Sequence, residues 1–249
     1  MKSRSPLFWA SMAGLAVLAA AFVPVVWQMV QPSRQPLALR SEGAAPWQID
    51  RGPNGELRAF GLQLPGSTLA DAVQRWGDDL QVALIASRGQ PVALEAYTDR
   101  WAGGGITGKL VLATDAQSAA VTRWQERSTR HERIDADAQR WGLRPEDRDD
   151  ALRSRIVGLS FLPSSKVDAA TLEARFGAPG EVLPGEGNTR HWLYPDRSLA
   201  IAWDEATGKA VLQVVLATAF EARLRAPVQA AAAALRASAA AASAAAAPR

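Results

Sequence analysis

The sequence predicts an α+β fold that follows an N-terminal transmembrane helix. Three observations carry this prediction: an uncharged run of 24 residues from Leu7 to Val30, short apolar segments joined by turn residues, and a strand–turn–helix pattern that occurs twice. Strands joined by short turns form antiparallel hairpins, and helices then pack against the sheet. We therefore expect two similar helix-plus-antiparallel-sheet halves joined by a charged helical segment.

The first expected element is a membrane helix over residues 7–30, preceded by a short cytoplasmic N-terminus of residues 1–6. An uncharged run of this length crosses a hydrocarbon core of roughly 30 Å. Trp9 and Trp27 lie near its two ends, where aromatic rings favour the membrane interfaces. The sequence therefore predicts a single-pass protein whose residues 7–30 contact the membrane.

The orientation follows from the charges beside this helix. Lys2, Arg4 and the free amine precede it, which favours a cytoplasmic N-terminus and a body in the periplasm, held at the cytoplasmic (inner) membrane. Two arginines also follow the helix closely, so the reversed topology is an alternative. A cleaved signal peptide is another, with residues 19–21 as the small-residue cleavage site, although residues 22–30 remain apolar.

A linker rich in Pro and Gly is expected over residues 31–56, followed by the first half over 57–115 and the second over 157–220. Each half begins with a strand and a Pro/Ser turn that leads into an amphipathic helix. The two helices end at Trp76-Gly77 and Phe176-Gly177. We expect both aromatic rings in the core and both glycines at positive φ, since glycine commonly ends a helix in the left-handed region.

Antiparallel strands are expected after each helix, separated by short polar turns. They are Leu80–Ala86, Val92–Tyr97 and Lys109–Thr114 in the first half, and Trp192–Tyr194, Leu199–Trp203 and Ala210–Leu216 in the second.

The connector between the halves, residues 116–156, has bulky groups at helical spacing, which predicts a helix from Ala116 to about Trp141 and a second short helix starting at Pro145. Nine arginines and nine acidic residues in 115–155 predict a salt-bridged surface. The C-terminal tail, residues 221–249, is rich in Ala and has no apolar stripe, so we expect it to fray without packing.

The charge distribution argues against nucleic-acid binding. The chain has 28 basic and 25 acidic residues, but four basic residues precede residue 41 and four follow residue 220, together with one acid. Residues 41–220 therefore hold 20 basic and 24 acidic residues, a net charge of −4. A nucleic-acid binder needs a basic face to neutralise phosphates.

The composition also argues against cofactors and nucleotides. The chain has no Cys and only two His, which excludes thiol catalysis, iron–sulfur clusters and thiolate metal sites. Gly103 to Lys109 has the spacing of a phosphate-binding loop, but Leu110 stands where a Ser or Thr must hold magnesium, and a strand follows where the motif requires a helix. We expect no cofactor and no nucleotide.

Exposed aromatic residues would mark a binding surface, because Trp and Tyr dominate interaction hot spots. The candidates for such a surface are Trp101, His191, Trp192 and Tyr194. The sequence thus favours a membrane-anchored, extracytoplasmic binding or scaffold protein that contacts another envelope protein and is not an enzyme. The alternatives are an envelope hydrolase that uses His191 with carboxylates such as Asp99 or Asp196, and a cytoplasmic-facing adaptor if the topology is reversed.

Several segments between residues 57 and 220 resemble a bacterial family with one N-terminal membrane anchor and no assigned activity. They include GLQLPGSTLADAVQRWGDDLQVALIA, IVGLSFLPSSKVDAATLEARFGAPGE and LYPDRSLAIAWD. Residues 163–216 are also remotely similar to outer-membrane assembly lipoproteins of the SmpA/OmlA type and to the repeat of the beta-lactamase inhibitor protein. Those proteins carry a lipidated Cys or a disulfide, which this chain lacks, and neither resemblance implies a site residue.

Overall fold

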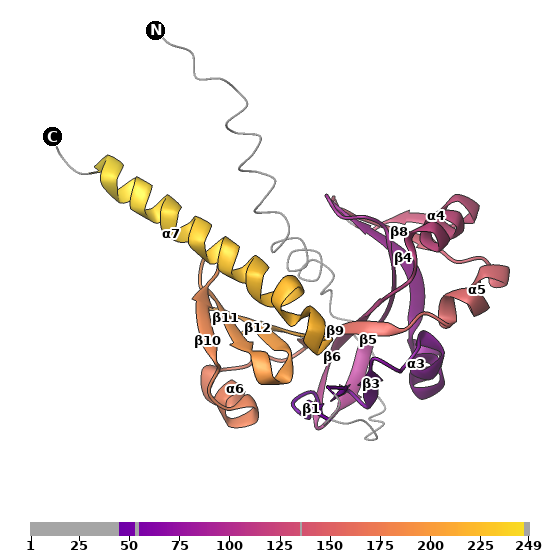
Figure 1. The fold of residues 1–249 in the computed structure, drawn as a ribbon, viewed down its shortest axis with the longest axis horizontal. Helices are drawn as coiled ribbons and strands as arrows, with labels where there is room; N and C mark the ends of the chain where they lie inside the picture. Colours follow the sequence, from indigo (N-terminus) through magenta and orange to yellow (C-terminus); the bar gives the residue numbers. More distant parts are fainter. Residues whose placement is uncertain (1–44, 53–54, 135, 247–249) are drawn as a thin grey trace, which may run out of the picture.

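The structure is a computed structural model that describes residues 45–52, 55–134 and 136–246 (Figure 1). Its centre is a ten-stranded antiparallel sheet in the order β10-β11-β12-β13-β9-β6-β5-β4-β8-β7, and a second, three-stranded sheet has the order β1-β2-β3. The α+β class is therefore confirmed. The strands of the large sheet are β4 (Gln81–Ser87), β5 (Ala93–Gly103), β6 (Ile106–Thr114), β7 (His131–Arg133), β8 (Ala138–Gly142), β9 (Ile156–Pro163), β10 (Glu181–Pro184), β11 (Thr189–Tyr194), β12 (Leu199–Asp204) and β13 (Ala210–Val215).

Strand β9 lies in the middle of the large sheet and joins the two expected halves. It pairs with β6 on one side, from Gly108↔Pro163 onward, and with β13 on the other, from Leu212↔Phe161 onward. On the β6 side lie β5, β4, β8 and β7, and on the β13 side lie β12, β11 and β10. The strands expected before the two helices differ in place, because β9 is central whereas β3 (Leu62–Leu64) lies in the small sheet with β1 (Asp50–Arg51) and β2 (Leu57–Ala59).

The helices expected to end at Gly77 and Gly177 are α3 (Leu69–Trp76) and α6 (Ala169–Phe176), and both begin with a side-chain cap. Thr68 and Asp71 form a capping box on α3, and Asp168 accepts a hydrogen bond from the Thr171 amide on α6. Both helices end at a glycine with positive φ, 63° at residue 77 and 74° at residue 177, as predicted.

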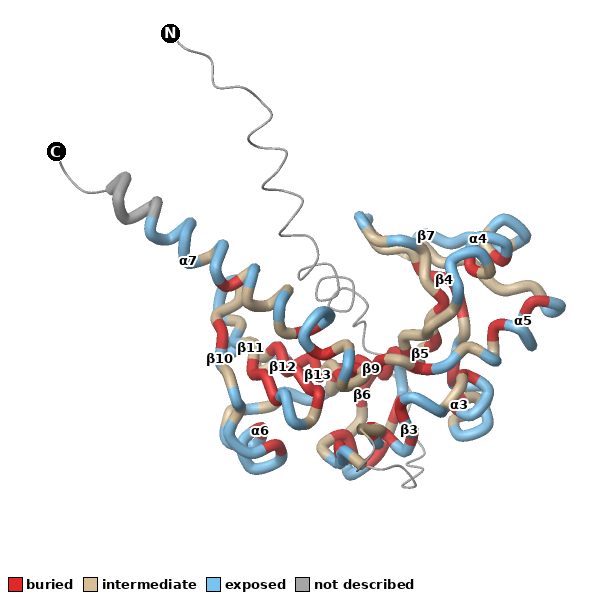
Figure 2. The backbone as a smooth tube through the Cα atoms, viewed as in Figure 1, coloured by how far each residue is buried: buried red, intermediate tan, exposed pale blue. Residues whose placement is uncertain are grey.

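The main core fills one face of the large sheet. Phe176 is buried there as predicted, and Trp76 is partly buried against the same core. Three rings tie the sheets together: Phe60 from the β2–β3 turn, Trp101 from β5 and Phe161 from β9, with centroids 5.1–5.4 Å apart. Such edge-to-face contacts add stability beyond area burial. Figure 2 shows the buried backbone along the centre of the sheet and exposed helix surfaces at its margins.

The connector differs from the prediction of a helix reaching Trp141. Its helix α4 (Ser118–Arg127) is short and is followed by the β7–β8 hairpin, whose β8 pairs with β4 and extends the sheet; α5 (Pro145–Leu152) comes next. This segment forms a hairpin because His131 and Trp141 make a cross-strand pair, in which the two rings stack with their centroids 4.8 Å apart. Sequence spacing alone does not separate such a pair from two residues on one helix face.

The C-terminal segment packs, contrary to the expectation of a frayed tail. Helix α7 (Ala226–Ala246) follows a π-helical turn, and Leu224 and Ala232 are buried against Leu183 and Leu193 on the sheet face opposite the main core. The expectation was wrong because a small Ala side chain permits close approach to the sheet without a wide apolar stripe. Beyond these turns the helix extends past the sheet (Figure 1).

The N-terminal predictions are only partly described. Residues 45–52 of the predicted 31–56 linker belong to the fold, since Ala45 and Ile49 are buried and β1 pairs with β2. The predicted membrane helix, residues 7–30, lies outside the described residues. Within the described residues, no helix is long and apolar enough to span a membrane.

Candidate functional site

The four residues predicted as a binding surface do not form one. Trp101, Trp192 and Tyr194 are only 3%, 6% and 5% exposed, and they pack in the main core. Tyr194 donates a hydrogen bond to the Gly177 carbonyl at 3.1 Å. His191 is partly buried on β11, where burial lowers the pKa of its imidazole.

In the alternative catalytic set, His191 and Asp99 are separated in space. His191 lies on β11 and Asp99 on β5, with β12, β13, β9 and β6 between them in the sheet. Five strand spacings of about 4.8 Å place these two positions on the order of 24 Å apart. Asp196 lies in the turn after β11, near His191 along the chain, but no hydrogen bond or ion pair between the two side chains is present among the described residues.

The structure instead gathers polar side chains on the sheet face opposite the main core. Strand β5 alternates between Leu94 and Ala96, which are buried in that core, and Glu95, Tyr97 and Asp99, which point to the other face. Neighbouring strands complete the group. We call it the polar face, and it consists of Gln81, Glu95, Tyr97, Asp99, Lys109, Glu132 and Arg140.

Arg140 is the central cation of the polar face. Its position on β8 is opposite Ile85, yet its guanidinium reaches Gln81 at 3.3 Å and also donates to the Tyr97 hydroxyl and to the Glu132 carboxylate. The side chain must pass over position 83 to do so. Ala83 leaves room for it, since any longer side chain there would point into its path.

Tyr97 lies between two cations. Its hydroxyl donates to Gln81 Oε1 at 2.7 Å, and Lys109 Nζ lies 5.0 Å from the ring centroid while pairing with Asp99 at 3.0 Å. Burial raises the pKa of the Tyr97 phenol, and the neighbouring Arg140 charge opposes that rise. Tyr97 therefore stays protonated and can donate its hydrogen bond.

Glu95 is a carboxyl on the polar face whose pKa is strongly shifted. Burial raises its pKa to about 7, and the charge of Lys109 opposes the rise. Its register neighbours are Ala83 and Ala113, which offer no polar group to stabilise a carboxylate. Some solvent still reaches the residue, so Glu95 can exchange its proton with water.

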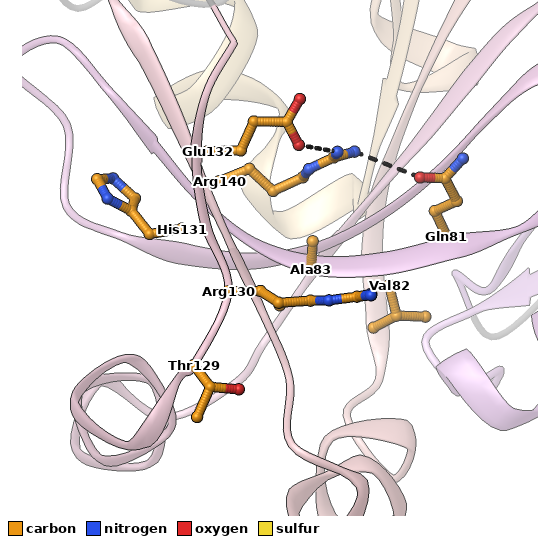
Figure 3. A pocket seen from close by; sticks show the side chains of 9 residues that line it. Gln81, Val82, Ala83, Thr129, Arg130, His131, Glu132 and Arg140 are labelled. Atoms are coloured by element: carbon orange, nitrogen blue, oxygen red, sulfur yellow. Dashed lines mark hydrogen bonds and ion pairs between the residues drawn. The ribbon is translucent and has the colours of Figure 1, made fainter.

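A cavity of about 520 Å³ adjoins the polar face where β8 ends. The last β4–β8 pair is Ala83↔Gly142, so β4 continues to Gln81 beyond its neighbour. Figure 3 shows Arg130 and Arg140 extending in the same direction on either side of Ala83. The lining residues are Gln81, Val82, Ala83, Thr129, Arg130, His131, Glu132, Arg140 and Gly142.

The chemistry of this site is that of a polar cavity with fixed charges. Within the described residues, no group of three or more His, Asp or Glu side chains is placed to hold a metal ion. The acids Asp99 and Glu132 are held in ion pairs. The cavity is thus lined by hydrogen-bonding side chains, some positively and some negatively charged, and it can hold a polar ligand.

Of the polar face, only Asp99 could be singled out from the sequence. The available signal was the alternation Glu95-x-Tyr97-x-Asp99, which begins on the strand predicted for Val92–Tyr97 and puts three polar side chains on one face if that strand continues to Asp99. The partners on β7 and β8 could not be found because that segment was predicted as a helix.

Comparison of the chain with models of known protein families, with characterised proteins and with solved structures finds no match.

Proposed function

We propose that the protein is a single-pass inner-membrane protein whose periplasmic body binds another envelope protein through the polar face and its cavity. Residues 7–30 would anchor the chain, and the body would comprise two similar helix-plus-sheet halves, in agreement with their matching glycine-ended helices. Binding rather than catalysis is proposed for one main reason: Lys109 pairs with Asp99, and Arg140 pairs with Glu132. Paired groups present a fixed pattern of charge, which gives specificity to an interface.

A hydrolase is the second candidate, and it rests on Glu95. A carboxyl with a pKa of about 7 can both accept and donate a proton near neutral pH, as general acid–base catalysis requires. The original form of this hypothesis, with His191 and Asp99, is disfavoured by the distance between β11 and β5. We prefer the binding function because the polar face, as defined above, contains no Ser, Thr or Cys side chain that Glu95 could activate as a nucleophile.

The anchoring and orientation are tested with reporter fusions. Alkaline phosphatase fused after Ser41 is expected to be active in a Gram-negative host, whereas a cytoplasmic reporter at the same position is expected to be inactive. The opposite pair of results would reverse the topology and support a cytoplasmic-facing adaptor.

The binding role is tested by photo-crosslinking in cells. A photoreactive amino acid at Thr129, which lines the cavity, is expected to give a defined protein adduct. The same amino acid at Val182, which is 48% exposed on the edge strand β10, serves as the control and is expected to give none. Equal labelling at both positions, or none at either, would contradict the assignment of the polar face as the binding surface.

A further inference from the structure

We propose that the cavity beside the polar face is an oxyanion site that binds a carboxylate or phosphate group through Arg130, with Arg140 and Gln81 as supporting donors. This inference rests on the proposed binding function and names the chemistry of the group that is bound.

Arg130 is the first reason. Every other ionisable group that lines the cavity has a partner: Arg140 and Glu132 pair with each other, and His131 bonds to Gln139. Arg130 uses its backbone to bond with Ser128 and Gly142, while its guanidinium makes no ion pair or hydrogen bond within the described residues. Among the described residues, the lining of the cavity therefore carries one positive charge that no acidic side chain pairs with.

The second reason is the way in which Arg130 is held. A Cβ built on Gly142 would lie 3.1 Å from Arg130 Cβ and 3.4 Å from its Cδ, so the Arg130 side chain lies along the bare backbone of β8. From there it extends beside Ala83, parallel to Arg140 (Figure 3). Gly142 and Ala83 thus leave space for two guanidinium groups that approach the same end of β4, one from β8 and one from the residue before β7.

The third reason is the donor set. Arginine presents a planar fork of N–H groups that matches the oxygens of a carboxylate or phosphate, and charge-assisted bonds of this kind are short and strong. Gln81 adds an amide and Thr129 a hydroxyl at the same cavity. Glu132 does not repel an incoming anion strongly, because Arg140 already neutralises it.

The test uses the full-length protein in a neutral detergent and measures binding by isothermal titration calorimetry. Sodium phosphate and sodium succinate are the soluble probes, and vesicles containing phosphatidylglycerol are a third probe that presents phosphate on a lipid. Binding of at least one probe is expected. The soluble probes and the vesicles distinguish a free or peptide-borne anion from a lipid headgroup.

Two variants and a control locate the site. Arg130→Gln is expected to weaken binding about tenfold or more, because a charge-assisted bond is lost. Gly142→Ala keeps every charge but displaces Arg130, so it is expected to weaken binding while leaving the circular dichroism spectrum unchanged. Arg133→Gln removes an exposed charge from β7, three residues further along the chain and outside the cavity, and is expected to have no effect.

The proposal is overturned if no probe binds, or if Arg130→Gln and Arg133→Gln have equal effects on binding. Either result would leave the photo-crosslinking experiment standing, so failure of the oxyanion site is distinguishable from failure of the binding function. A protein adduct at Thr129 without anion binding would mean that the partner is recognised by other contacts.

Discussion

The sequence allows two roles for Trp101, as an exposed side chain of a binding surface or as a buried side chain of the core. The structure places it in the core, where it contacts Phe60 and Phe161 with both ring centroids at 5.1 Å. Replacing it with Ala is expected to destabilise the fold strongly, because the ring connects the small sheet, β5 and β9 at one point.

The magnitude follows from the area that the ring buries. A buried Trp removes roughly 200 Å² from water, and about 25 cal/mol per Å² gives about 5 kcal/mol as an upper limit. Trp101→Ala is therefore expected to cost about 3–5 kcal/mol of unfolding free energy. Trp101→Phe is expected to cost less than half as much, since Trp101 Nε1 has no hydrogen-bond partner to lose among the described residues.

Urea unfolding of the full-length protein, followed by far-UV circular dichroism, measures the effect. With a slope of about 2 kcal/mol per M, Trp101→Ala lowers the midpoint by about 1.5–2.5 M. Arg123→Ala is the control, because its ion pair with Asp150 is half exposed on both sides and contributes about 0–1 kcal/mol. A Trp101→Ala midpoint equal to that of the control would refute the core assignment.

Three further predictions concern other parts of the fold. A chain ending after Pro227 loses the packing of α7 on β10, so calorimetry is expected to show a melting temperature lower by about 5 °C or more, whereas a chain ending after Ser238 is expected to melt like the full chain. An equal effect of both truncations would contradict the packing. Wild-type stability is expected to fall as pH rises from about 4.5 to about 7, because the unfolded chain releases the Glu95 proton at lower pH than the folded chain does. Glu95→Gln is expected to flatten that part of the plot of urea midpoint against pH. An unchanged slope in this variant would show that burial does not raise the Glu95 pKa. Phe176→Ala is expected to destabilise more than Trp76→Ala in the same assay, since Phe176 is buried and Trp76 only partly so, and the reverse order would contradict their burial.

The repeated helices could be predicted from the sequence because their signals are local. A capping residue begins each helix, and a glycine after an aromatic residue ends it, so propensity and tertiary structure agree at Gly77 and Gly177. The β7–β8 hairpin could not be predicted, since His131 and Trp141 owe their proximity to strand pairing with β4. The packing of α7 also escaped prediction, because it depends on close approach of Ala232 rather than on a recognisable apolar stripe.

The site was less predictable than the fold for a related reason. The partners of Tyr97 come from β4 and β8, which lie 16 and 43 residues away along the chain. No spacing rule connects such positions. Asp99 was noticed as a carboxylate, but its Lys109 partner becomes evident only when β5 and β6 are paired. Trp101 and Trp192 were misassigned because residue type alone does not distinguish an interface aromatic from a core aromatic.

The central position of β9 has a consequence for how the chain could be divided. A cut between α5 and β9 would yield two pieces, each with a long unprotected edge: β6 on the N-terminal piece and β9 on the C-terminal piece. Such edges associate with any available strand. Their best match is each other, because the β6–β9 ladder runs from Gly108↔Pro163 to Thr114↔Ile156. Two separately expressed fragments are therefore expected to reassemble through β6 and β9, and either fragment alone is expected to aggregate.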